Sequence, residues 1–347
     1  MIRVLVAEDS STARKLLVAI LRGDPEFSVV GEAKNGLEAV ELAKQLKPDL
    51  VTMDIQMPVL DGLEATRRIM IESATPIVIV SSLNPTDVTA TMHSLNAGAL
   101  AVLNKPEGPG SPGFEENVRQ FLSTLKAMSQ VKIVRRWPST PPYRSAEPPP
   151  PPVLPGRPVR VVAIAASTGG PAALRRLVAD LPAEFEPPIL VVQHIAVGFA
   201  RGMAEWLNTI GVVRVKVAEQ GEALRSHTIY IAPDNVHLGV AGGAVQLSHD
   251  PPVAGFRPSG THLFRSVANA YGNAAVGVIL TGMGQDGVKG LAELREADGI
   301  VIAQDEASSE IYGMPGAAVA AGLTNLVLPL ADIAPRLVSL AARSRTG

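Results

Sequence analysis

Short apolar runs alternate with amphipathic segments along the first 127 residues. Each run has the length of a buried strand, and each following segment has its apolar positions at helical spacing. The strands are predicted at 2–7, 28–33, 50–53, 77–80 and 100–103, and the helices at 12–22, 36–46, 63–72, 87–96 and 115–127. Five such units predict a parallel sheet covered by helices on both faces.

The same alternation returns after residue 158 and continues to the end of the chain. Long apolar strands are predicted at 161–166, 189–192 and 275–280, and shorter ones at 213–217, 228–231, 236–240 and 244–247, the shorter ones including a hairpin excursion. Helices are predicted at 200–208, 259–271, 288–296 and 316–321. This pattern predicts a second α/β domain, doubly wound and mostly parallel.

A proline-rich segment separates the two patterns. Ten of the 29 prolines lie between Pro138 and Pro158. Such a segment buries little and prefers the extended polyproline II conformation. We therefore expect domains at 1–127 and 158–347, joined by a linker at 128–157 that acts either as a tether or as a ligand for a proline-binding module.

Composition narrows the function. Of the 347 residues 46% are hydrophobic, the net charge is −2, and no basic run stands out, so the sequence predicts no nucleic-acid partner. The chain has no cysteine, which excludes disulfides, thiolate zinc sites and cysteine nucleophiles. No apolar stretch approaches the roughly 18–20 residues of a membrane span, and no signal peptide is apparent. We expect a cytoplasmic protein without direct membrane insertion.

In the first domain, charged and hydroxyl side chains follow four of the five predicted strands. They are Glu8, Asp9, Asp54, Ser82 and Lys105. The carboxyl ends of parallel strands meet at one edge of the sheet, so these groups should converge there. Three carboxylates in one place repel one another, and an oxygen-seeking cation such as Mg²⁺ would relieve the repulsion. The alternative is that they are ordinary loop acids.

The first 127 residues resemble the receiver domain of two-component response regulators, a flavodoxin-like (βα)5 fold. The matching stretches are VLVAEDS, MDIQMPVLDG, IVSSL and LNKP. The resemblance implies a histidine kinase as phosphodonor, phosphorylation of Asp54, and contacts of Ser82 and Lys105 with the phosphoryl group. It further implies Mg²⁺ held by Glu8, Asp9, Asp54 and the carbonyl of Gln56.

In the second domain, Ser167, His194 and Asp286 each follow a predicted buried strand. A serine needs an adjacent base to become a nucleophile, and that base needs a partner that fixes its tautomer, so these residue types suit a hydrolytic triad. Backbone N–H groups of the glycine-rich loop 281–287 are candidates for an oxyanion hole. Three alternatives remain: a structural histidine with Asp286 as a helix cap, a nucleotide-binding crevice, or a phosphorylation-gated binding module without catalysis.

Residues 158–347 resemble the catalytic domain of chemotaxis protein-glutamate methylesterases of the CheB type. The motifs are ASTGGP, VVQHI, YIAPDNVHL, FRPS, TGMGQDG and QDEASSEIYGMPGAAVAAG. The resemblance implies a serine hydrolase with Ser167 as nucleophile, His194 as base, Asp286 as the orienting acid and the Met283 N–H at the oxyanion. The implied substrates are glutamyl methyl esters on methyl-accepting chemoreceptors, with glutamine deamidation as a second activity. The chain departs from the family at Ala196, where proline is frequent, and at Gly260-Thr261, where Val-Asp is usual.

Overall fold

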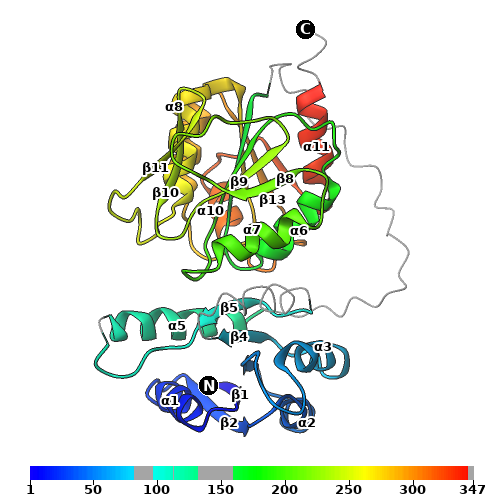
Figure 1. Ribbon diagram of the computed structural model, residues 1–347, viewed down its shortest axis with the longest axis vertical. Coiled ribbons are helices and arrows are strands. Elements are labelled where there is room, and N and C mark those ends of the chain that lie inside the picture. The colour runs from blue at the N-terminus through cyan, green and yellow to red at the C-terminus, as the bar shows by residue number, and fades with distance from the viewer. Residues whose placement is uncertain (82–96, 112, 132–158, 343–347) are drawn as a thin grey trace. The chain divides into compact units, whose positions relative to one another are not determined.

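The computed structural model describes residues 1–81, 97–111, 113–131 and 159–342 (Figure 1). The chain divides into two compact units, Met1–Ser139 and Thr140–Gly347. Each unit contains a parallel sheet whose central strands are almost completely buried. The prediction of two α/β domains is therefore confirmed.

The sheet of the first unit has the strand order β2-β1-β3-β4-β5, with parallel pairing throughout. Its strands are β1 (Ile2–Ala7), β2 (Phe27–Ala33), β3 (Leu50–Met53), β4 (Ile77–Ser81) and β5 (Ala101–Asn104). The chain moves outward from β1 to β2 and returns on the other side of β1 as β3. That reversal opens a crevice at the carboxyl ends of β1 and β3.

Capping side chains set where the helices of the first unit begin. These helices are α1 (Ser11–Arg22), α2 (Gly36–Leu46), α3 (Gly62–Glu72) and α5 (Phe114–Ser129). Ser10, Asn35 and Asp61 each accept a hydrogen bond from a backbone N–H in the first turn of α1, α2 and α3, which satisfies a donor that the helix leaves unpaired. The helix expected at 87–96 lies outside the described residues.

Helix α5 continues to Ser129, two residues into the segment expected to be linker. The reason is Met128, whose side chain is fully buried in the first unit, so the helix must include it. The proline-rich residues 132–158 lie outside the described part of the chain.

The main sheet of the second unit has the order β14-β13-β12-β6-β7-β9-β8, and every pairing in it is parallel. Its strands are β6 (Val161–Ala166), β7 (Ile189–Gln193), β8 (Arg214–Val217), β9 (Thr228–Ile231), β12 (Ala275–Ile279), β13 (Ile300–Gln304) and β14 (Leu326–Leu328). The prediction of short strands with a hairpin excursion is right only for β10 (His237–Ala241) and β11 (Ala244–Ser248), which pair antiparallel. Strands β8 and β9 extend the main sheet instead.

Helices cover both faces of this sheet (Figure 1). They are α6 (Gly170–Asp180), α7 (Ala200–Asn208), α8 (Gly260–Tyr271), α9 (Val288–Glu296), α10 (Met314–Ala320) and α11 (Leu330–Ala342). Buried residues of α8, α9 and α10 share one core with the alternate β6 residues Val161, Ala163 and Ala165. Helix α6 packs against α7 and α11 on the opposite face (Figure 1).

Among the described residues, no helix combines the length and the apolar character that crossing a bilayer requires.

Candidate active site

Ser167 lies where the strand order of the second sheet reverses. Strands β7 and β9 lie on one side of β6, and β12 and β13 on the other, so the crevice of the sheet opens at the carboxyl ends of β6 and β12. The Ser167 N–H donates to the Thr281 carbonyl at 3.0 Å, which ties the end of β6 to the loop after β12. The switch point of the sheet thus positions the serine.

Gln193, the last residue of β7, ties the turn that carries Ser167 to the loop that carries His194. Its side-chain Nε2 donates to the carbonyl of Ser167 at 2.7 Å and to the carbonyl of His194 at 2.8 Å. The His194 N–H in turn donates to the Ala166 carbonyl at 2.9 Å. The backbones that carry the two side chains are therefore fixed relative to each other.

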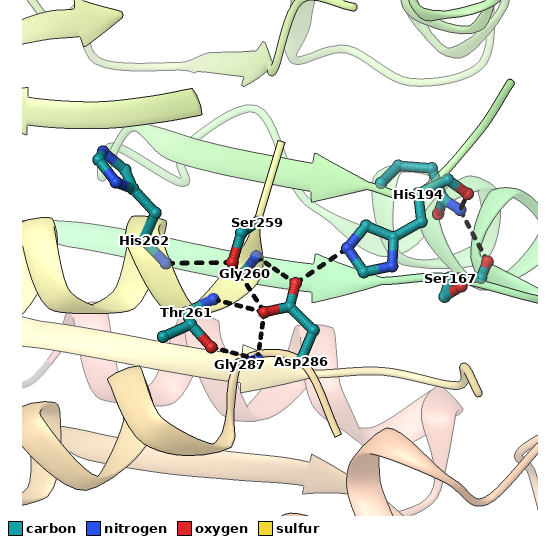
Figure 2. A network of polar contacts seen from close by, with 9 residues as sticks. Ser167, His194, Ser259, Gly260, Thr261, His262, Asp286 and Gly287 are labelled. Atoms are coloured by element: carbon teal, nitrogen blue, oxygen red, sulfur yellow. Dashed lines mark hydrogen bonds and ion pairs between the residues drawn. The ribbon is translucent and has the colours of Figure 1, made fainter. Parts of the chain in front are cut away.

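The imidazole of His194 bonds Asp286 through its outer nitrogen. His194 Nε2 lies 2.9 Å from Asp286 Oδ2, and the imidazole lies between Asp286 and Ser167 in the view of Figure 2. Its other nitrogen, Nδ1, is buried and has no hydrogen-bond partner. With Nε2 donating to the carboxylate, Nδ1 carries the lone pair that can accept a proton.

Asp286 is buried among donors from the start of α8. Ser259 Oγ donates to its Oδ1 at 2.7 Å, the Gly260 N–H to its Oδ2 at 2.6 Å, and the Thr261 N–H to its Oδ1 at 3.1 Å (Figure 2). Burial by itself would raise the pKa of Asp286, but His194, Ser259 and Gly260 outweigh it and hold the pKa below its ordinary value. The carboxylate stays ionised because its donors replace water.

These contacts bear on one alternative, Asp286 as a helix cap, and on one departure from the family pattern, at Thr261. Asp286 accepts the N–H of Gly287, the residue that precedes α9, at 2.9 Å, but the first turn of α9 has no side-chain cap. It also accepts from the free N–H groups at the N-terminus of α8, where a negative charge is stabilised. The departure at Thr261 is also accommodated, since its hydroxyl accepts the Gly287 N–H at 2.9 Å and fastens α8 to the loop that carries Asp286.

Met283 lies in the loop that contacts Ser167. The neighbouring Gly282 is held on both sides, its N–H by the carbonyl of Ile311 at 3.0 Å and its carbonyl by the N–H of Met314 at 2.8 Å. In the described part of the chain, no hydrogen bond uses the Met283 N–H. This donor therefore remains unused among the described contacts.

A second cluster occupies the crevice of the first sheet. One carboxylate oxygen each from Glu8, Asp9 and Asp54 lie within 4.8 Å of one another. Lys105 Nζ lies 2.8 Å from Glu8 Oε2 and 3.0 Å from Asp54 Oδ2. An all-oxygen donor set of this size fits a hard divalent cation such as Mg²⁺.

The charges of this cluster perturb one another. Burial raises the pKa of Asp54, although the Lys105 ammonium opposes the effect, and burial likewise raises the pKa of Glu8. Burial would lower the pKa of Lys105, but its contacts with Glu8 and Asp54 outweigh burial and raise it. Gln56 lies exposed in the loop after Asp54. Ser82 lies outside the described residues.

Sequence reasoning missed three residues of the candidate active site: Gln193, Phe256 and Ser259. All three lie inside the motifs VVQHI and FRPS, and a polar residue at a strand end and another just before a helix were the available signals for Gln193 and Ser259. The aromatic ring of Phe256 stacks on the imidazole of His194. No periodicity marks that contact, because 62 residues separate the two rings along the chain (256 minus 194).

Comparison with known proteins finds relatives of both units. The family model "CheB methylesterase" matches residues 162–337, and "Response regulator receiver domain" matches residues 4–111. A protein-glutamate methylesterase/protein-glutamine glutaminase of Myxococcus xanthus is 60% identical over 97% of this chain and 96% of its own length. One of Anaeromyxobacter dehalogenans is 56% identical over 97% and 98%.

A solved structure gives the same fold for the second unit. The CheB methylesterase catalytic domain of Thermotoga maritima is 36% identical, with a TM-score of 0.51, and the match covers 52% of this chain and 98% of that one. The fold and the matches define a response regulator whose output domain is a hydrolase. The chain belongs to the CheB methylesterase family, as its motifs indicated.

Proposed function

We propose that this protein is a phosphorylation-activated protein-glutamate methylesterase. It would hydrolyse glutamyl methyl esters on the cytoplasmic helices of methyl-accepting chemoreceptors to glutamate and methanol, in the cytoplasm and in the service of chemosensory adaptation. The observation that carries the proposal is the placement of His194, whose Nε2 is held by Asp286 and whose Nδ1 has no partner. The names of the similar proteins of M. xanthus and A. dehalogenans support the substrate.

In the proposed reaction, Ser167 Oγ attacks the ester carbonyl while His194 Nδ1 takes its proton. The oxyanion that forms accepts the N–H of Met283. His194 then gives the proton to the departing methoxide, methanol leaves, and a glutamyl ester of Ser167 remains. Water, deprotonated by the same nitrogen, releases glutamate and restores the serine. Glutamine deamidation follows the same steps with ammonia as the leaving group.

Asp286 acts in this scheme without exchanging a proton. Its donors keep it ionised, so it fixes the Nε2–H tautomer of His194 and stabilises the imidazolium that forms when Nδ1 is protonated. The usual arrangement presents Nε2 to the serine and Nδ1 to the acid. Here the two ring nitrogens exchange roles.

The first domain is proposed to control this reaction. A chemotaxis histidine kinase would phosphorylate Asp54, with Mg²⁺ held by Glu8, Asp9, Asp54 and the Gln56 carbonyl. The cation would supply charge neutralisation at the phosphodonor. Ser82 and Lys105 are proposed to bind the phosphoryl oxygens. The ion pair between Lys105 and Asp54 supports this part, because it places the ammonium beside the acceptor carboxylate.

Methanol release from membranes that carry methyl-esterified chemoreceptors tests both the proposed hydrolysis and its proposed control by phosphorylation. Wild type should release methanol faster when Mg²⁺ and a small phosphodonor are added, whereas Asp54→Ala should show only the basal rate. Ser167→Ala should release none, yet still become phosphorylated. Undiminished release by Ser167→Ala would refute the nucleophile, and equal stimulation of Asp54→Ala would refute control by that residue. Absence of release from every preparation would favour a binding module.

A further inference from the structure

The ring of Phe256 lies flat against the imidazole of His194. Their centroids are 4.1 Å apart and their planes differ by 2°. We infer that Phe256 is a positioning residue for the hydrolytic reaction: it holds the plane of His194, whose unpartnered Nδ1 lies on the side of the ring toward Ser167 in the view of Figure 2. This inference rests on the proposed function and goes beyond it, since Phe256 touches neither Ser167 nor Asp286 in any described contact.

A tight turn fixes the position of Phe256. Its backbone N–H and carbonyl exchange two hydrogen bonds with Val253, each 3.0 Å long, across Ala254 (φ 51°) and Gly255 (φ 86°). Two central residues with positive φ are typical of the turns that join paired strands. The next residue, Arg257, donates its Nε–H to Asn235 Oδ1 at 2.9 Å. This bond anchors the chain on the C-terminal side of Phe256.

The same segment of chain holds Asp286. Ser259 and Gly260, three and four residues beyond Phe256, supply donors to the carboxylate at 2.7 and 2.6 Å. The segment 256–260 therefore constrains His194 twice, at one face of the ring through Phe256 and at Nε2 through Asp286. Any displacement of this segment would move both constraints together.

Both constraints are needed for geometric reasons. The covalent bond at Cγ and the hydrogen bond from Nε2 to Asp286 fix two points of the imidazole. The ring remains free to rotate about the axis through these points, which would change the direction in which Nδ1 points. A ring stacked flat on one face removes this rotation. It also excludes water from that face, and its π-electrons attract the imidazolium that forms during the reaction.

The kinetic test replaces the ring while keeping an apolar side chain. Phe256→Leu should lower kcat about tenfold and change KM less than about twofold, because the loss is one of orientation rather than of substrate binding. Phe256→Tyr keeps the stacked ring and should retain kcat within about twofold of wild type. Methanol release from methyl-esterified receptor membranes gives both constants.

A spectroscopic signature separates positioning from a general loss of structure. The carbon-bound protons of the His194 imidazole should be shielded by the current of the Phe256 ring in the NMR spectrum of the full chain, with the signals assigned by His194→Gln. They should move downfield in Phe256→Leu and remain shielded in Phe256→Tyr. Unchanged shifts in Phe256→Leu would show that the rings are not stacked in solution and would overturn the inference.

A matched control sits at the opposite end of β7. Phe185 is buried and precedes this strand, whereas His194 follows it. Phe185→Leu should lower stability without changing kcat, so an equal loss of kcat there would overturn the role of Phe256. An inactive Ser167→Ala beside a fully active Phe256→Leu would overturn this inference alone, whereas an active Ser167→Ala would overturn the proposed function.

Discussion

Asp286 owes its charge to hydrogen-bond donors that form only in the folded chain. The donors of Ser259, Gly260 and Thr261 hold the carboxylate together with His194. Its pKa is therefore lower in the folded than in the unfolded chain, where an aspartate titrates near 3.9. The unfolded chain then binds a proton more readily in acid, so this contribution to stability is present above about pH 4 and is lost as the pH falls further.

We predict that Asp286→Asn lowers the free energy of unfolding of the catalytic domain by about 2 kcal/mol at pH 7. The difference from wild type should shrink as the pH is lowered from 4 to 3, because the unfolded wild-type chain takes up a proton at Asp286 in this range while the folded chain stays ionised. The free energy of unfolding is measured by denaturant titration, followed by the fluorescence of Trp206 in α7. Both proteins carry Trp137→Phe, which removes the fluorescence of the other tryptophan. A difference that grows in acid would contradict the assigned direction.

The Gln193 side chain depends on Gly170, three residues after Ser167. A Cβ on Gly170 would lie 1.9 Å from Gln193 Oε1, so any larger residue displaces the amide that binds the carbonyls of Ser167 and His194. We predict that Gly170→Ala lowers kcat by about tenfold, through misplacement of the two side chains.

A double-mutant cycle checks this explanation. Gln193→Ala alone should lower kcat by a similar factor, and Gly170→Ala in that background should add little, because the colliding amide is gone. If the two factors by which kcat falls multiplied in the double variant, Gly170→Ala would act independently of Gln193, for instance through helix α6 itself.

Helices α8 and α9 approach closely where α9 carries Gly290. A Cβ there would lie 2.4 Å from the Thr261 carbonyl and 2.9 Å from the Phe264 Cβ. Alanine favours an isolated helix over glycine by about 1 kcal/mol. We nevertheless predict that Gly290→Ala destabilises the catalytic domain by about 1–3 kcal/mol, since overpacking outweighs propensity.

Lys289→Ala serves as the control, because Lys289 is exposed and next to Gly290 in α9. Its free energy of unfolding should stay within about 0.5 kcal/mol of wild type. If Gly290→Ala proved more stable than wild type, helix propensity would dominate and the close packing of α8 on α9 would not hold in solution.

Periodicity predicted the elements well, because burial and hydrogen-bonding needs are local. The predictions at 228–231 and 288–296 match β9 and α9. Helix α8 begins at Gly260, one residue after its predicted start, because Ser259 is its N-cap. Pairing partners are not local, so the sequence did not show that β8 and β9 join the main sheet.

For the candidate site too, the sequence predicted which residues come together but not how they are oriented. Strand ends indicated Ser167, His194 and Asp286, since the carboxyl ends of parallel strands converge whatever the intervening sequence. The sequence did not predict the orientation of these side chains. It did not show which nitrogen of His194 bonds Asp286, nor that Phe256 stacks on the ring, because these contacts involve side chains from three different loops.

The two compact units of the molecule have separate buried cores. We predict two calorimetric transitions for the full chain, and that Mg²⁺ raises only the one that belongs to the receiver. At a Mg²⁺ concentration of 100 times Kd the gain is about 2.7 kcal/mol. Asp9→Asn removes a carboxylate of the cluster without touching the Lys105 ion pairs and should weaken this response.

Chelation of Mg²⁺ by excess EDTA should return the receiver transition to its metal-free temperature. A cation that shifted both transitions equally would bind elsewhere or act through general screening, and the carboxylate cluster would lose its assigned role.

The donors that saturate Asp286 limit how many protons can move in the chemical step. A carboxylate already accepting from Ser259, Gly260 and Thr261 is a weak base. In the proposed reaction, the hydrogen on His194 Nε2 would therefore stay where it is while Nδ1 takes one from Ser167. Only one proton would then be transferred in the rate-limiting transition state. In mixtures of light and heavy water the turnover rate should fall along a straight line with deuterium content, whereas a two-proton relay would bend it.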